Sequence, residues 1–312
     1  MAAKDLITTA RAKQDIQAIT DSSQDALIAT LITACSDAIE KYCRRDFNAK
    51  SYDELYNGTG DHRLLLRQYP IQLVKSVRYR PVTVLKVTNT NPANVQARVA
   101  VTSIGLTLTR VDAGVTDTDT SVTFAGNATL AAAAASINAL GKSWFAQVVG
   151  DATNYGSWPF ADLYVPPSFG DGASSQGALQ CVAGSFAELK MHTYELAGYQ
   201  FDPRGWLLRA IPYSDPELLD PDELTFPAGV NNFRVQYTAG YTTVPESVQE
   251  ACAQWVAELW YQTKRDPAVL TTSVVGTTSA SYNPALTTDA PPPRVKALLA
   301  PYRRRSIDTS NG

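Results

Sequence analysis

The residues best suited to catalysis or metal binding are few in this chain. It has two histidines, His62 and His192, and four widely separated cysteines: Cys35, Cys43, Cys181 and Cys252. There is no HExxH, GxSxG, P-loop or CxxC pattern, so zinc, acyl-transfer and phosphate chemistry have no local signature. Neither histidine has an obvious carboxylate partner nearby in sequence, and we expect structural or surface roles for both. Cys35 and Cys252 fall on apolar helix faces, where small thiols pack.

Other polar stretches favour turns and solvated loops over binding sites. "GTGDHR" (58–63) lies between strand-like runs and opens no helix, so it lacks the context of a phosphate loop. "DTDT" (117–120) and "DPELLDPDE" (215–223) lack the spacing of an EF-hand. We therefore predict no catalytic residue, no metal site and no cofactor. An enzyme is disfavoured because the sequence offers no convergent polar cluster.

Length and composition further narrow the class of protein. The chain has 312 residues, a length that suits one large domain or two modest ones. Its net charge is −3 and its pI is near 5.5, so it has no global electrostatic field that would attract nucleic acid or membrane. No run of 18 apolar residues is present, so no transmembrane helix is expected. The start "MAAKDLITTARAKQDIQ" lacks an apolar core, and no secretory signal is expected. Four separated thiols are typical of a reducing cytosol.

Two long helices are expected to position the other elements of the fold. From residue 25 the apolar positions step by three, four and seven, which predicts an amphipathic helix ending near Arg45–Asp46. A second helix follows Pro245, and one of its faces carries Val248, Cys252, Trp255, Val256, Leu259 and Trp260. We expect these two apolar faces to pack together, although some two hundred residues separate them in sequence.

The remaining segments read mostly as strands. "SYDELYNGTGDHRLLLRQYPIQLVKSVRY" predicts a strand, an Asn-Gly turn, a second strand and a turn at Tyr69–Pro70. Residues 82–190 alternate like half-buried strands around one alanine-rich helix, with Thr129 as a cap and Gly141 as a stop. "PPSFGDGASSQG" (166–177) predicts a flexible loop.

These patterns together predict an α+β fold: a discontinuous α-helical bundle core with short β-hairpins, plus an inserted β-rich module. The predicted parts are 1–81 (the N-terminal part of the helical core), 82–190 (the inserted β-rich module with its Ala-rich helix), 191–266 (a core hairpin and the second long helix) and 267–312 (a flexible loop and a basic tail). The insertion follows because residues 82–190 separate two helices that are expected to touch.

The basic tail leaves three interpretations open. "VKALLAPYRRR" has an apolar edge of Val295, Leu298, Leu299 and Tyr302 that ends in arginines. It is a solvated disordered end, a phosphate-contacting arm, or a short helix that docks on an acidic protein partner. The arm lacks the interleaved aromatic residues of strand-binding surfaces. Docking is favoured, because an apolar edge with flanking charges is typical of segments that order on a partner.

Two stretches resemble the head–tail connector (adaptor, or head-completion) proteins of tailed bacteriophages, in a long form with a β-rich insertion. The first is "DALIATLITACSDAIEKYCRRDF" with the hairpin and "YPIQLVKSV" after it. It matches the family at Ala34, Ser36, Ile39, Glu40, Tyr42, Arg45, Phe47, Tyr52, Tyr56, Gly58, Gly60, Pro70, Ile71, Val74, Ser76 and Val77. The second is "FRVQYTAGYTTVPESVQEACAQWVAELWYQTKRDP", followed by a Ser/Thr/Gly loop and "LLAPYRRR". Together they cover about half of the chain.

The resemblance implies a structural virion protein at the neck of the particle, made in the bacterial host cytoplasm. Such proteins form a ring, usually of twelve copies, beneath the portal. They extend the DNA channel, through which the genome passes without sequence-specific binding, and present a platform to a stopper or tail-completion protein. Partners are thus other copies of the chain, the portal and the tail-side protein, with no membrane.

The resemblance also assigns residues. In the family the C-terminal segment commonly reaches onto the portal, which agrees with the docking interpretation and implies portal contacts for Arg294, Leu298, Leu299, Tyr302, Arg303, Arg304 and Arg305. Arg44, Arg45 and Asp46 are implied as inter-subunit or channel-side charges. The role of residues 82–190 stays open between outward decoration, which is favoured, and contact with a neighbouring copy. The alternative function is another phage structural part, such as a tail-completion or head-decoration protein.

Overall fold

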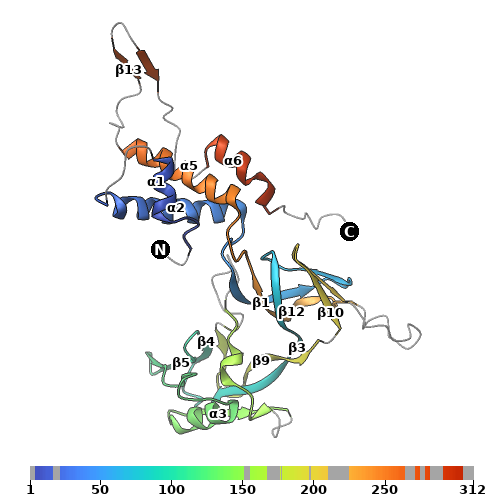
Figure 1. Cartoon of the computed structure of the whole chain (residues 1–312). Coiled ribbons are helices and arrows are strands. Elements are labelled where there is room, and N and C mark those ends of the chain that lie inside the picture. The colour runs from blue at the N-terminus through green and yellow to red at the C-terminus, as the bar shows by residue number, and fades with distance from the viewer. Residues whose placement is uncertain are drawn as a thin grey trace, which may run out of the picture.

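The structure is a computed structural model that describes residues 4–16, 22–150, 155–166, 176, 178–196, 198–209, 225–263, 271–274, 278–281 and 291–304. Its elements form three tiers (Figure 1): a group of helices at one end, an antiparallel sheet in the middle, and a β-rich part with one helix at the other end. Buried apolar side chains of the described part gather in three clusters that follow these tiers.

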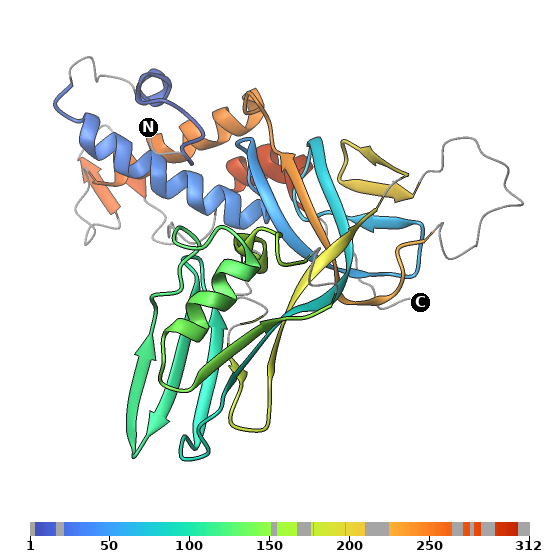
Figure 2. The same cartoon turned by 90° about the horizontal axis from the view of Figure 1, so that it is seen from below.

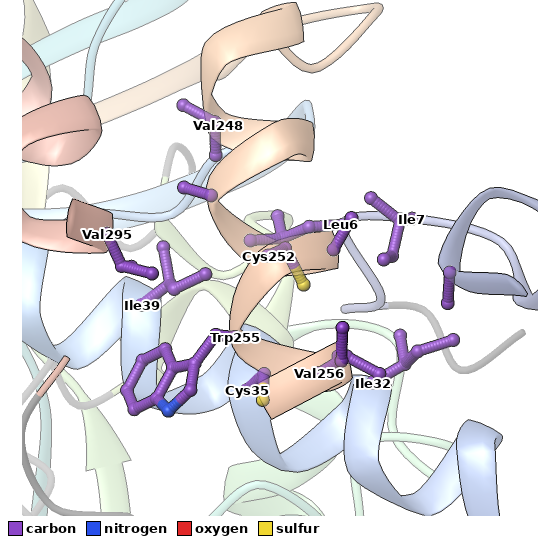
Figure 3. Close-up of a cluster of buried hydrophobic side chains, with 14 of the residues drawn as sticks. Leu6, Ile7, Ile32, Cys35, Ile39, Val248, Cys252, Trp255, Val256 and Val295 are labelled. Carbon is purple, nitrogen blue, oxygen red and sulfur yellow. The ribbon is translucent and has the colours of Figure 1, made fainter. Parts of the chain in front are cut away.

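The helical tier consists of α1 (Thr9–Asp15), α2 (Asp25–Cys43), α5 (Glu246–Thr263) and α6 (Pro293–Leu299), which runs into the short turn η4 (Ala300–Tyr302). The apolar faces of α2 and α5 meet (Figure 3), with Cys35 and Ile39 on one side and Cys252 and Trp255 on the other. The predicted packing of these two helices is confirmed. α2 ends at Cys43, slightly earlier than predicted, because Arg44 adopts a left-handed conformation with φ of 54°.

The central sheet is built from strands that are distant in sequence. Its strands are β1 (Lys50–Gly58), β3 (Ile71–Asn89), β7 (Trp144–Val148), β9 (Ala187–Glu195) and β12 (Gly229–Ala239). The order is β1-β12-β3-β7, β9 also pairs with β3, and every pairing is antiparallel. The first part of β3 pairs with β12 and the second part with β7 and β9, so β3 belongs to both the middle tier and the β-rich tier.

A small sheet completes the middle tier. It consists of β2 (Arg63–Leu65), β10 (Tyr199–Asp202) and β11 (Trp206–Arg209), in the order β10-β11-β2. Leu64 and Leu207 from this sheet share a buried cluster with Val235 and Tyr237 of β12. The predicted hairpin across Asn57-Gly58 is wrong, because β1 pairs with β12 while β2 pairs with β11.

The third tier is a four-stranded sheet covered by one helix. The strands are β4 (Gln96–Val101), β5 (Leu106–Asp112), β6 (Val115–Asp119) and β8 (Leu179–Gln180), in the order β6-β5-β4-β8. Helix α3 (Leu130–Ala139) lies over this sheet in the turned view (Figure 2), and a turn, η1 (Phe160–Leu163), lines the same cluster. The alanine-rich helix is confirmed, with Thr129 accepting the N–H of Ala132 as its cap.

The described part of the C-terminal region contains a further hairpin. Within the stretch expected to be a flexible loop, β13 (Thr271–Val274) and β14 (Thr278–Ser281) form an antiparallel hairpin that extends beyond the helices in Figure 1. The acidic stretch 215–223 and most of the predicted loop 166–177 lie outside the described residues.

The predicted fold class, a discontinuous α-helical bundle core with short hairpins, is wrong. The described part is β-rich, with several antiparallel sheets, one group of packed helices and the separate helix α3. The helices could be predicted from the sequence because the spacing of their apolar residues is a local pattern. The sheet could not be predicted in the same way, because strands such as β1 and β12 pair although about 180 residues separate them in sequence. Local alternation of apolar residues does not reveal such partners. The division into parts at 82–190 stays a prediction, and β3 runs without interruption through its first boundary.

Candidate functional site

The four cysteines are free and buried. Cys35 and Cys252 lie at the contact between α2 and α5. Burial raises the pKa of all four thiols, to about 11 for Cys43 and to about 12 for Cys181 and Cys252. The thiols are therefore protonated at neutral pH, and the predicted packing role of Cys35 and Cys252 is confirmed.

The two histidines make local contacts. His62 is exposed, its Nδ1 lies 2.6 Å from a carboxylate oxygen of Asp61, and Arg63 Nε donates to its Nε2 at 3.1 Å. The expectation that no carboxylate is nearby is thus wrong for His62, whose partner directly precedes it in sequence. His192 is buried, with Nε2 at 2.8 Å from the carbonyl oxygen of Asn231. Burial lowers the pKa of His192, so the ring is neutral and Nε2 donates to that carbonyl.

The triplet at the end of α2 divides between the surface and the interior. Arg44 is exposed, whereas Arg45 and Asp46 are buried, at 3% and 8% exposure. The Arg45 guanidinium lies 3.7 Å from the centre of the Tyr69 ring and donates to the Tyr69 carbonyl oxygen. The Asp46 carboxylate accepts the Tyr52 hydroxyl at 2.8 Å and pairs with Lys50. Arg45 and Asp46 therefore hold α2 against the following chain of the same subunit.

A buried carboxylate and two tyrosines connect β1, β12 and the segment before β3. The Glu54 carboxylate accepts the hydroxyls of Tyr56 and of Tyr237, the latter at 2.8 Å. The same two hydroxyl oxygens accept the backbone N–H groups of Arg67 at 2.9 Å and Gln68 at 3.2 Å. Burial raises the pKa of both tyrosines, so they remain protonated donors. Sequence spacing shows Glu54 and Tyr56 on one strand face, but nothing local predicts Tyr237 opposite them.

A second buried carboxylate lies inside α2. Glu40 is 7% exposed, and its Oε1 accepts the Phe47 N–H at 3.2 Å. Burial, reinforced by the nearby charge of Asp46, raises the pKa of Glu40 to about 6. Together with Arg45, this residue fixes the chain where it leaves the helix and enters the sheet.

Arginine residues clamp the β-rich tier to the central sheet. Arg234 on β12 is 3% exposed and forms a two-pronged pair with Asp53 on β1, at 2.9 and 2.7 Å. The same guanidinium donates to the carbonyl oxygens of Asp162 at 2.6 Å and Tyr164 at 3.2 Å. Arg78 pairs with the Asp162 carboxylate at 3.0 Å. The sequence does not reveal this clamp, because its members come from elements that are far apart in the chain.

The C-terminal segment packs on its own chain. Leu299 is fully buried, and Leu298 and Tyr302 pack against the helical cluster. The Tyr302 hydroxyl lies 2.8 Å from the Ser247 hydroxyl, and the Arg304 N–H donates to the Cys43 carbonyl oxygen at 2.9 Å. The apolar edge predicted to dock on a partner is thus largely used within the subunit.

The exposed arginines of this segment lie over the helical tier. The Arg303 guanidinium lies 5.1 Å from the centre of the Tyr42 ring. Arg294 is exposed and lines a groove of about 420 Å³ with Asp15, Glu250 and Glu258. Arg305 lies outside the described residues. The structure thus leaves Arg294 and Arg303 available at the surface, while the contacts implied by the resemblance stay a prediction.

These contacts define a scaffold in which charged and aromatic groups connect helices to sheet and sheet to insertion. In the described part, no group of three or more His, Cys, Asp or Glu side chains is placed to hold a metal ion. None of the described helices is long and apolar enough to cross a bilayer. The arrangement joins the three tiers through buried charged and aromatic contacts.

The comparisons with known proteins indicate the class of protein. Residues 6–136 match the model of a family described as head completion protein. This confirms the resemblance to the phage head-completion and connector proteins. The family is one of structural phage proteins, not of enzymes, and the match implies a structural role for this chain at the completion of the head of the virion. A search of curated proteins finds no match.

Proposed function

We propose that this protein forms an oligomeric ring beneath the portal, extends the DNA channel and joins the filled head to the tail or to a stopper. The observation that carries the proposal is the family match over residues 6–136, which includes α1, α2 and the first part of the central sheet. A ring of identical copies uses one heterologous contact repeated around an axis. The copy number that the resemblance suggests is twelve.

The described surface supports a contact with the portal through the C-terminal segment. Because α6 and η4 are already folded on the subunit, the portal would meet a prepared surface that carries Arg294 and Arg303, with Arg44 at the nearby end of α2. An acidic portal surface would complement these charges. Leu299 would support that surface from beneath, since it is buried in the helical cluster.

The charge of the whole chain suits a DNA channel. The net charge is −3, and a wall with many phosphate-binding cations would hold the genome tightly instead of letting it pass. We propose that DNA passes without sequence-specific contacts and that the β-rich tier, at the opposite end from the helices (Figure 1), faces outward.

Electron microscopy of lysates from a phage lacking this gene tests the proposal. Filled or leaking heads beside separate, complete tails would support a role at the junction. Normal tailed particles would contradict it and would favour head decoration instead. Heads that carry a portal but do not retain DNA would agree with an adaptor or a stopper platform. Labelling the protein in complete particles then separates a neck position from a tail-completion role.

A further inference from the structure

The outer edge of β1 has no hydrogen-bonding partner among the described residues. β1 pairs with β12 along one side. Along its other side, the backbone of residues 50–57 makes no hydrogen bond within the part of the chain that the structure describes. The strand contains no proline, and its one register shift lies at its far end, between Tyr56 and Gly58. Proteins usually shorten, bend or cover such edges, because an open edge pairs with other strands.

A groove runs along the first half of β1. A groove of about 460 Å³ is lined by five consecutive residues of β1, from Lys50 to Glu54, and by Asp46, Gln68, Lys75, Pro166 and Gln236. Side chains of a strand alternate between the two faces of a sheet. The groove therefore follows β1 over five residues, and it also extends across the sheet to Gln236 on β12 and Lys75 on β3.

The opposite edge of the same sheet is β9. The order β1-β12-β3-β9 is antiparallel at each step, so β1 and β9 run in opposite directions. The side chain of Gln176 covers β9 at Lys190, where it accepts the backbone N–H at 2.7 Å and donates to the carbonyl at 3.1 Å. Beyond that point, no described hydrogen bond covers the outer backbone edge of residues 192–195.

We infer that the edge of β1 in one copy pairs antiparallel with residues 192–195 of β9 in the next copy, so that the central sheets join around the ring. This inference rests on the proposed ring. Rotation about a ring axis brings opposite edges of one sheet together, and the opposed directions of β1 and β9 make that pairing antiparallel.

The charges suit one register. With Ser51 opposite Tyr194, Lys50 faces Glu195, and opposite charges across a strand pair are stabilising. Both Lys50 and Glu195 are exposed in the subunit. β9 pairs with a later part of β3 than β12 does, so the joined sheets would be staggered, which is what closing a sheet requires.

The test introduces cysteines at Ser51 and Tyr194 in a phage carrying this gene and oxidises the purified particles. Facing residues of an antiparallel pair lie about 4.5–5.5 Å apart at Cα, within reach of a disulfide. The native thiols are buried. The double variant should give a ladder of covalent multimers in steps of 33.8 kDa on a denaturing gel, and the single variants should give monomers.

Other outcomes would overturn the inference. Dimers from Ser51→Cys alone would show two β1 edges paired symmetrically. Monomers from the double variant, in particles that show a ring by microscopy, would contradict the sheet pairing but not the proposed function. Wild-type particles without a ring would contradict both the proposed function and the pairing, so the two failures are distinguishable.

Charge reversal provides an independent readout if the cysteine variants do not assemble. Lys50→Glu and Glu195→Lys should each lower the yield of infectious particles, and the two together should restore it. Arg98→Glu, a reversal at an exposed residue of β4, is the matched control and should leave the yield unchanged. A double variant no better than either single one would contradict the pairing.

Discussion

Arg44 and Arg45 adjoin in sequence, yet their surroundings give them different roles. Arg45 is buried among Phe47, Tyr69 and Tyr241, and its guanidinium stacks on these rings. We predict that Arg45→Ala lowers the free energy of unfolding by about 2–4 kcal/mol, since it removes a desolvated cation–π contact and a charged hydrogen bond. Chemical denaturation of the purified protein measures this loss.

Arg44→Ala is the matched control and should change stability by less than about 0.5 kcal/mol, because Arg44 is exposed. Arg44→Glu then tests the proposed role of this triplet in assembly without unfolding the subunit. A reversal at Arg45 cannot do so, since it would place an acid among buried aromatic rings. An Arg45→Ala protein as stable as the wild type would contradict the structural role assigned here.

The buried acid Glu40 predicts a pH dependence. Its pKa is raised from 4.5 to about 6, so the folded state binds the proton more tightly than the unfolded state. Stability contributed by protonation is present at low pH and is lost as the pH rises from about 4.5 through about 6. The loss should be at most about 2 kcal/mol. Glu40→Gln should remove this part of the pH dependence, as measured by urea unfolding at several pH values. Identical pH profiles for the two proteins would refute it.

At the scale of elements, the Arg234–Asp53 pair connects the central sheet to η1. Arg234→Ala removes the cation that pairs with a partly buried carboxylate, which keeps its hydrogen bond from the Gln236 amide, and frees two carbonyl groups. We expect a loss of about 3 kcal/mol and faster amide exchange at residues 160–164. Arg78→Ala is the control: its pair with Asp162 is about a quarter exposed on each side, and its loss should cost no more than about 1 kcal/mol. Equal effects of the two variants would show that Arg234 has no special role.

The second element-scale prediction concerns α6. Leu299 is fully buried against the helical tier, so Leu299→Ala should cost about 2–5 kcal/mol. Lys296→Ala, on the exposed side of the same helix, should cost less than about 0.5 kcal/mol. Thermal unfolding measures both. If Leu299→Ala is neutral in the isolated protein and defective only in portal binding, the segment docks on the partner and not on its own chain.

Elements defined by local patterns were predictable, and elements defined by distant partners were not. The spacing of Ile32, Cys35 and Ile39 predicted α2 and its apolar face, and Thr129 predicted the start of α3. The long strand β3, by contrast, is stabilised by three strands from other parts of the chain, and its sequence does not reveal them. The buried polar contacts could not be predicted for the same reason, since Glu54 meets Tyr237 only once β1 and β12 pair.

At the scale of the molecule, the three tiers differ in how far they depend on one another. The helical cluster draws on both ends of the chain, whereas every buried member of the β-rich cluster lies between residues 84 and 191. A part of the chain with its own apolar core is expected to fold alone. The second half of β3 and the first half of β9 provide members of that core, such as Leu85 and Leu189.

We therefore predict that a fragment of residues 82–195 folds alone and unfolds cooperatively on heating, because it keeps the β3 pairings with β7 and β9 and the whole cluster. A fragment of residues 90–186 is the matched control. It keeps α3 and the sheet of β4, β5, β6 and β8, but it loses both long strands and should remain unfolded, as judged by near-ultraviolet circular dichroism and amide exchange. If both fragments fold, the core of this tier does not need the strands it shares with the central sheet. If neither folds, the tier depends on the Arg234 clamp, and the insertion is a continuation of the central sheet and not a separate module.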